Sequence, residues 1–118
     1  MNPGDTDAAV DGLKSQLPVN GPIRPPNGAN NIHSISGGVV AFICLGGYKP
    51  NIYVPDYTLY LATITNSCGR YVAGTYRLAD HGGGELRYFD AGYMNNYGNY
   101  NSAPFVHLFL YTESLLIL

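Results

Sequence analysis

The sequence is poor in charge and has no tryptophan. Asp, Glu, Lys and Arg make up only 12% of its 118 residues, about half of the share of roughly 25% that is usual in globular domains. Six basic residues stand against eight acidic ones, and the formal net charge of -2 argues against a nucleic-acid partner. Hydrophobic residues still make up 46% of the chain, which is enough for one small folded domain and too much for disorder throughout.

Long hydrophobic runs are also absent. The longest, residues 39–45 and 115–118, fall far short of the roughly 20 apolar residues that span a bilayer, so we expect no membrane partner. The first residues lack the basic start and apolar core of a signal peptide. Either the protein is cytosolic, or a signal peptide has been removed and Met1 was added afterwards.

Cysteine is scarce as well. The chain has two, Cys44 and Cys68, and neither lies in a CxxC motif or a Cys/His cluster of the kind that binds zinc. We therefore expect no metal and no cofactor. Each cysteine lies at the end of an expected strand, and a disulfide between them would close a loop of about 25 residues, worth roughly 3 kcal/mol. Such a bond implies an oxidising compartment at some stage, and two buried thiols are the alternative.

Two regions differ in composition. Residues 1–36 hold five of the eight prolines and no aromatic residue, which predicts a flexible N-terminal arm rich in proline, glycine and asparagine. A short helix over residues 7–17, with Thr6 as N-cap and Pro18 ending it, is compatible with this arm. Residues 37–118 form the folded domain.

The folded domain consists of short β-prone runs separated by turn residues. We expect strands at residues 39–45, 51–54, 57–65, 70–78, 85–93 and 104–112. The last of these is apolar on both sides and is typical of a central strand. Six strands about ten residues apart predict an all-β fold, a small six-stranded antiparallel β-sandwich or barrel.

Residues 93–101 are the most unusual stretch. Four asparagines and three tyrosines occur among these nine residues, without a charge. Tyrosine supplies rigid amphipathic contact area and asparagine supplies adaptable hydrogen bonds, a combination that recognition loops use and that also suits sugars. The alternative is a hairpin loop rich in asparagine because asparagine tolerates turns. The candidate binding residues are Tyr93, Asn96, Tyr97 and Tyr100.

Candidate catalytic groups are few. Asp80, His81, Glu85 and Asp90 lie around a glycine-rich turn and could converge as metal ligands or as an acid/base group, as in a small hydrolase or nuclease. An ordinary turn explains the same residues, because Asp favours turns and glycine supplies positive φ. Cys68 is a weak candidate nucleophile, since it is also the expected disulfide partner of Cys44. We therefore expect no catalytic residues.

A domain of short strands with one disulfide resembles the small secreted effectors of plant-pathogenic fungi of the ToxB-like or MAX type. Cys44 matches the cysteine in or near the first strand of that family, and Cys68 matches the second, which precedes a later strand. The resemblance covers about residues 36–112 and implies a disulfide-stapled six-stranded β-sandwich that binds a host protein without catalysis. Only 23 residues separate the cysteines, which is short for that fold, and residues 1–36 are additional.

The sequence therefore predicts a secreted, non-enzymatic protein of the effector type, with its signal peptide removed. Its expected partner is a host protein, bound through a strand edge or through the loop rich in tyrosine and asparagine. Three alternatives remain open: a carbohydrate-binding module, a viral or structural assembly protein that uses residues 1–36 and 115–118, and a hydrolase or nuclease that uses Asp80, His81 and Glu85.

Overall fold

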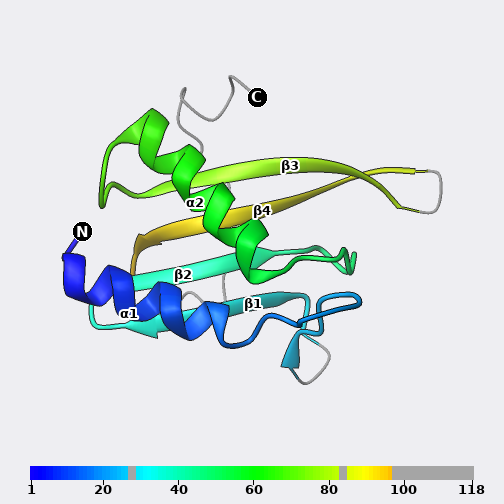
Figure 1. Ribbon diagram of the computed structural model, residues 1–118, viewed down its shortest axis with the longest axis horizontal. Coiled ribbons are helices and arrows are strands. Elements are labelled where there is room, and N and C mark those ends of the chain that lie inside the picture. Colours follow the sequence, from blue (N-terminus) through cyan, green and yellow to red (C-terminus); the bar gives the residue numbers. More distant parts are fainter. Residues whose placement is uncertain (27–28, 83–84, 97–118) are drawn as a thin grey trace.

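The computed structural model describes residues 1–26, 29–82 and 85–96, with only the backbone for residues 80–82 (Figure 1). Two helices and four strands follow one another as α1 (Pro3–Lys14), β1 (Asn31–Ser36), β2 (Val39–Cys44), α2 (Val54–Cys68), β3 (Gly74–Gly82) and β4 (Glu85–Asn95). The strands form one antiparallel sheet in the order β1-β2-β4-β3. Both helices lie on the same face of this sheet, α1 near β1 and β2, and α2 near β3 and β4 (Figure 1).

The expected all-β fold is wrong, because the chain forms a two-layer α/β structure instead of a six-stranded sandwich or barrel. The strand expected at 39–45 is β2, which ends one residue earlier at Cys44, and the strands expected at 70–78 and 85–93 correspond to β3 and β4 with shifted ends. The strand expected at 51–54 is not formed. The one expected at 104–112 lies outside the described residues.

The strand expected at residues 57–65 is part of α2. Pro55 lies in the first turn of this helix, and the Asp56 carboxylate accepts a hydrogen bond of 2.8 Å from the backbone N–H of Tyr53, which fixes the helix start. Tyr57, Leu61 and Ile64 recur at helical spacing and are buried against the sheet. The β-prone tyrosines, threonines and isoleucine of this segment are therefore overridden by the helical period of its apolar face.

Residues 1–36 are part of the fold instead of a flexible arm. The expected helix exists, but it begins at Pro3 with Asn2 as N-cap, whose side chain accepts a hydrogen bond of 2.9 Å from the N–H of Asp5. Leu13 of this helix is completely buried, as is Ile32 of β1. The expected boundary at residue 36 falls between the paired strands β1 and β2.

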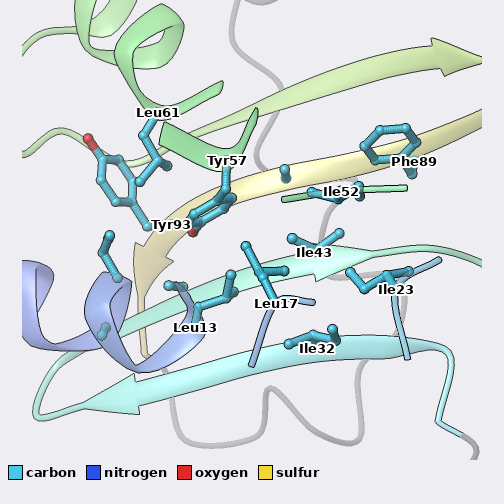
Figure 2. Close-up of a cluster of buried hydrophobic side chains, with 14 of the residues drawn as sticks. Leu13, Leu17, Ile23, Ile32, Ile43, Ile52, Tyr57, Leu61, Phe89 and Tyr93 are labelled. Carbon is cyan, nitrogen blue, oxygen red and sulfur yellow. The ribbon is translucent and has the colours of Figure 1, made fainter. Parts of the chain in front are cut away.

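The main core lies between the sheet and the two helices (Figure 2). Its largest completely buried side chains include Tyr57, Leu13, Ile23, Ile32, Ile43 and Ile52. β2 is buried along its whole length, because its odd-numbered residues face this core and its even-numbered residues face the other side of the sheet. A second, smaller cluster of Val40, Phe42, Cys44 and Met94 lies on that other side.

One buried hydrogen bond joins the two layers. The hydroxyl of Tyr57 in α2 donates to the carbonyl oxygen of Gly92 in β4 at 3.0 Å. Burial raises the pKa of Tyr57 far above its usual value, so this hydroxyl is a permanent donor. A Cβ at position 92 would collide with the carbonyl oxygen of Gly74, which explains the glycine at this point of the strand pair.

Candidate functional site

The β3–β4 hairpin is the most prominent surface feature. β3 is an edge strand of nine residues, and with β4 it extends past the other elements on one side of the molecule (Figure 1). Among the described strands only β4 pairs with β3. An edge strand presents a row of backbone N–H and C=O groups along its outer side.

Large apolar side chains are exposed on this hairpin. Leu86 and Tyr88 are 50% and 53% exposed, and they lie on the same side of β4 because side chains alternate along a strand. Glu85 precedes Leu86, and Arg87 lies between Leu86 and Tyr88. These two charged residues form a surface ion pair of 2.9 Å. The outer part of the hairpin therefore exposes large apolar side chains beside a charged pair.

A bidentate ion pair fixes the base of the hairpin. Arg77 and Asp90 are direct partners in the register of β3 and β4, and the Arg77 Nε and Nη2 atoms donate to the two Asp90 oxygens at 2.9 and 3.2 Å. Asp90 is only 3% exposed. The Arg77 guanidinium also lies 5.8 Å from the ring centroid of Tyr88. Asp90 is thus a structural partner of Arg77, a role that its position near the glycine-rich turn did not indicate.

A groove lies between the two helices. This inter-helix groove has a volume of about 310 Å³. Its apolar lining consists of Val10, Leu61, Ala62 and the ring of Tyr93. The polar lining residues are Thr6, Asp7, Thr58, Thr65, Arg70 and Tyr71.

Tyr71 lines the inter-helix groove and contacts α1 through Asp7. Its backbone has a positive φ of 58°, which is uncommon for a residue other than glycine. Its hydroxyl lies 3.2 Å from both carboxylate oxygens of Asp7 in α1, and the Arg70 guanidinium lies 5.0 Å from its ring centroid. Residues that are 64 positions apart in the sequence are thereby held together, a proximity for which the sequence offers no signal.

Of the four candidate binding residues, the structure describes Tyr93 and Asn96. Tyr93 is buried beside Leu61 on the helix side of the sheet, and its hydroxyl lies 3.4 Å from that of Thr65 (Figure 2). Asn96 lies beyond the end of β4, where its backbone N–H donates to the carbonyl oxygen of Gly38 at 2.8 Å. Tyr97 and Tyr100 lie outside the described residues. Tyr93 and Asn96 therefore have separate surroundings.

The expected disulfide is absent, because no bond joins Cys44 and Cys68 in the structure. Cys44 ends β2 and packs in the smaller cluster, whereas Cys68 ends α2 and packs against the main core. The sheet separates the two thiols. The strand that was expected to end near Cys68 is a helix on the opposite face, so the premise of the pairing does not hold.

The acidic and histidine residues near the hairpin turn were the candidate catalytic group. Glu85 is exposed and paired with Arg87, and the side chains of Asp80 and His81 lie outside the described part of the chain. Within the residues that the structure describes, no three His, Cys, Asp or Glu side chains form a cluster that would hold a metal ion. The same residues include no helix that is long and apolar enough to span a membrane.

No family model matches this sequence, and no curated protein or solved structure is detectably similar to it.

Proposed function

We propose that this protein is a non-enzymatic binding module that captures an extended segment of a partner protein along the outer side of β3. The observation that carries this proposal is the position of β3 as a nine-residue edge strand, in a hairpin that extends past the other elements. An extended peptide can add to such an edge through main-chain hydrogen bonds, while side-chain contacts supply specificity.

The edge is held rigidly, which favours binding because little ordering is needed when the partner arrives. The Arg77–Asp90 ion pair joins β3 to the central strand β4. On the helix side, the ring of Tyr76 packs edge-on against Tyr60 of α2, with 5.6 Å between the ring centroids. Both faces of β3 are thus anchored, and its outer edge pairs with no other strand among the described residues.

The side chains of the hairpin indicate the chemistry of the partner segment. Arg77 and Arg87 both have carboxylate partners within the hairpin, so the surface makes no strong demand for a charged ligand. Leu86 and Tyr88 offer exposed apolar area next to the edge strand. A segment with alternating apolar residues fits this surface best.

The test is selection of linear peptides from a phage-displayed library on the immobilised protein, followed by affinity measurement on two variants. Ala79 is an exposed residue of β3, and Ala79→Lys places a long charged side chain on the edge strand, a change that opposes strand addition. We expect at least tenfold weaker binding. Val19→Lys is the control, because Val19 is 94% exposed and far from the hairpin in sequence.

Peptides that bind Ala79→Lys as well as the unchanged chain would contradict capture by β3, as would failure to select any peptide. Loss of binding in Val19→Lys to the same extent would indicate a charge effect unrelated to the edge.

A secreted, effector-type role with a host protein as partner extends this proposal. The resemblance that suggested this role also implied a disulfide-stapled six-stranded sandwich, which the described residues do not form. The extension therefore requires independent evidence that the protein is exported by its natural producer. Detection of the chain in the culture medium, with a cytosolic marker absent from the medium, is the measurement that decides this extension.

The inter-helix groove favours carbohydrate as a second candidate ligand. Its lining combines hydroxyls, the Asp7 carboxylate, the Arg70 guanidinium, tyrosine rings and aliphatic side chains, a mixture suited to sugar hydroxyls and the apolar faces of sugar rings. A glycan array tests this candidate. Bound glycans should be lost in Arg70→Ala and retained in Arg24→Ala, whose side chain is exposed elsewhere.

A further inference from the structure

The sheet has two edge strands, β1 and β3, and the sequence of β1 lacks the residues that usually protect an edge. Each of the two pairs with one strand among those described. Proline, lysine and other charged residues discourage a foreign strand from pairing with an edge, and β1 contains no proline, Lys, Arg, Asp or Glu. The formal net charge of -2 adds little repulsion between copies of the chain. Protection of β1 therefore depends on another part of the molecule.

The strand register shows which backbone groups of β1 point outward. The N–H of Leu45 donates to the carbonyl oxygen of Asn30 at 3.1 Å, one position before the listed ladder of β1 and β2 begins. Hydrogen-bonded and non-bonded pairs alternate along an antiparallel ladder. Counted from Asn30, the odd-numbered residues of β1 therefore direct their N–H and C=O groups away from β2. His33, in the middle of β1, is one of these residues.

The side chain of Gln16 occupies this outer edge. Its Nε2 donates to the carbonyl oxygen of His33 at 2.9 Å, and it also lies 3.3 Å from the carbonyl oxygen of Gly12. Gln16 follows α1 in a turn, in which its N–H donates to the carbonyl oxygen of Leu13 at 2.9 Å. The next residue, Leu17, is buried in the main core. The amide is thus presented to the edge by a backbone that is anchored on both sides.

Close packing of α1 on β1 brings Gln16 within reach of the edge. A Cβ at position 12 would collide with the hydroxyl of Ser34 in β1, so the glycine lets the helix lie directly on this strand (Figure 1). Gln16 follows Gly12 by about one helical turn. A strand that pairs with β1 must displace the Gln16 amide to reach the carbonyl oxygen of His33.

An open β1 edge would create a route to self-association. β3 of one copy could then pair with β1 of the next, and because the two surfaces differ, the contact would repeat from copy to copy without closing. Closing one of the two edges is enough to stop this extension. We propose that Gln16 closes β1 and prevents its head-to-tail pairing with β3 of a second copy of the chain. This inference rests on the proposed function, because it takes β3 to be open to strand addition.

The test is the substitution Gln16→Ala, studied by sedimentation velocity over a series of protein concentrations. We expect the concentration at which half of the chains are associated to fall at least tenfold relative to the unchanged chain. Ser15→Ala is the control, because the Ser15 hydroxyl donates to the carbonyl oxygen of Gly12 at 2.7 Å and makes no contact with β1. A Gln16→Ala chain that sediments like the unchanged one at every concentration would overturn the proposal.

A second substitution identifies the other strand of the contact. Ala79 is an exposed residue of β3, and Gln16→Ala/Ala79→Lys should lose the added association, because a lysine on this strand opposes pairing. Gln16→Ala/Val19→Lys carries the same charge at a position that is 94% exposed, and it should associate like Gln16→Ala. Association that persists in Gln16→Ala/Ala79→Lys would contradict pairing through β3.

Hydrogen exchange distinguishes edge pairing from association through unfolding. In Gln16→Ala, the amides of β1 should exchange more slowly as the protein concentration rises, because a second copy covers their outer side. Faster exchange of β1 on association would assign it to local unfolding and refute the proposal. Selected peptides that bind β3 while Gln16→Ala stays monomeric would remove this inference alone. Association of Gln16→Ala through β3 when no peptide is selected would support it and leave the proposed peptide capture without support.

Discussion

The buried hydroxyl of Tyr57 connects α2 to the centre of β4. Its acceptor, the carbonyl oxygen of Gly92, lies in a strand pair so close that a side chain at this position would collide with β3. Gly92 therefore has two roles: its carbonyl oxygen accepts the hydrogen bond from α2, and its lack of a side chain allows the close approach of β3. The spacing of the apolar residues of α2 makes Tyr57 a predictable core residue, but its hydroxyl contact depends on the packing of the two layers.

Replacing Tyr57 by phenylalanine keeps the ring and removes the donor. We expect Tyr57→Phe to lower the free energy of unfolding by about 1–3 kcal/mol, because the Gly92 carbonyl loses its partner in a buried site. Urea denaturation followed by circular dichroism measures the change. Tyr88→Phe removes an exposed hydroxyl and should stay within about 0.5 kcal/mol of the unchanged chain. Equal effects of the two substitutions would show that the buried hydrogen bond is not the cause.

His33 makes the stability of the fold depend on pH. Partial burial lowers the pKa of His33 below its usual value of 6.5, because it disfavours the charged imidazolium. The unfolded chain then binds more protons than the folded one as the pH falls below 6.5, so this contribution is complete above pH 6.5 and is lost on acidification. His33→Gln should therefore reduce the fall in urea midpoint between pH 7 and pH 5. A fall of the same size in both proteins would assign it to other groups.

A substitution in α1 tests whether residues 1–36 belong to the folded domain. Leu13 of α1 is completely buried in the main core, within residues expected to be flexible. We expect Leu13→Ala to lower the free energy of unfolding by about 2–5 kcal/mol, measured by urea denaturation. Val19→Ala, at a position that is 94% exposed, should have little effect. A neutral Leu13→Ala would mean that α1 contributes little to the stability of the domain.

The predictions differed in outcome for a physical reason: the strand at β2 was predicted, whereas α2 was predicted as a strand and β1 as part of a flexible arm. Residues 39–45 are uniformly apolar, a pattern that only an element buried on both sides produces, and β2 is such an element. Residues 57–65 are rich in tyrosine, threonine and isoleucine, and their β propensity concealed the helical spacing of Tyr57, Leu61 and Ile64. The proline content of residues 1–36 similarly concealed that Pro3 occupies the first turn of a helix, where proline is favoured.

The candidate sites were harder to predict from the sequence than the secondary-structure elements. The Arg77–Asp90 ion pair depends on the register of β3 and β4, and the groove that includes Asp7 and Tyr71 depends on how both helices pack. Sequence spacing carries neither piece of information. The exposed hairpin is closer to what a sequence allows, because an edge strand was part of the expected binding surface.

At the scale of the whole molecule, the sheet order β1-β2-β4-β3 places strands side by side that are far apart in the sequence. β2 pairs with β1 across a two-residue turn, but its other neighbour, β4, begins 41 residues after β2 ends, as the bounds at Cys44 and Glu85 show. α2 and β3 lie between them in the sequence. The central pairing of the sheet is therefore one of its most non-local contacts.

This order has a consequence for the growing chain on a ribosome. Until β4 has emerged, β2 has one open side, and its six apolar residues form a strand edge that other nascent chains can pair with. The helices can cover one face of β2 during this interval, but they cannot satisfy its backbone. A pause in translation before residue 85 would therefore prolong the period in which the protein is most prone to aggregation, and chaperone dependence should be greatest there.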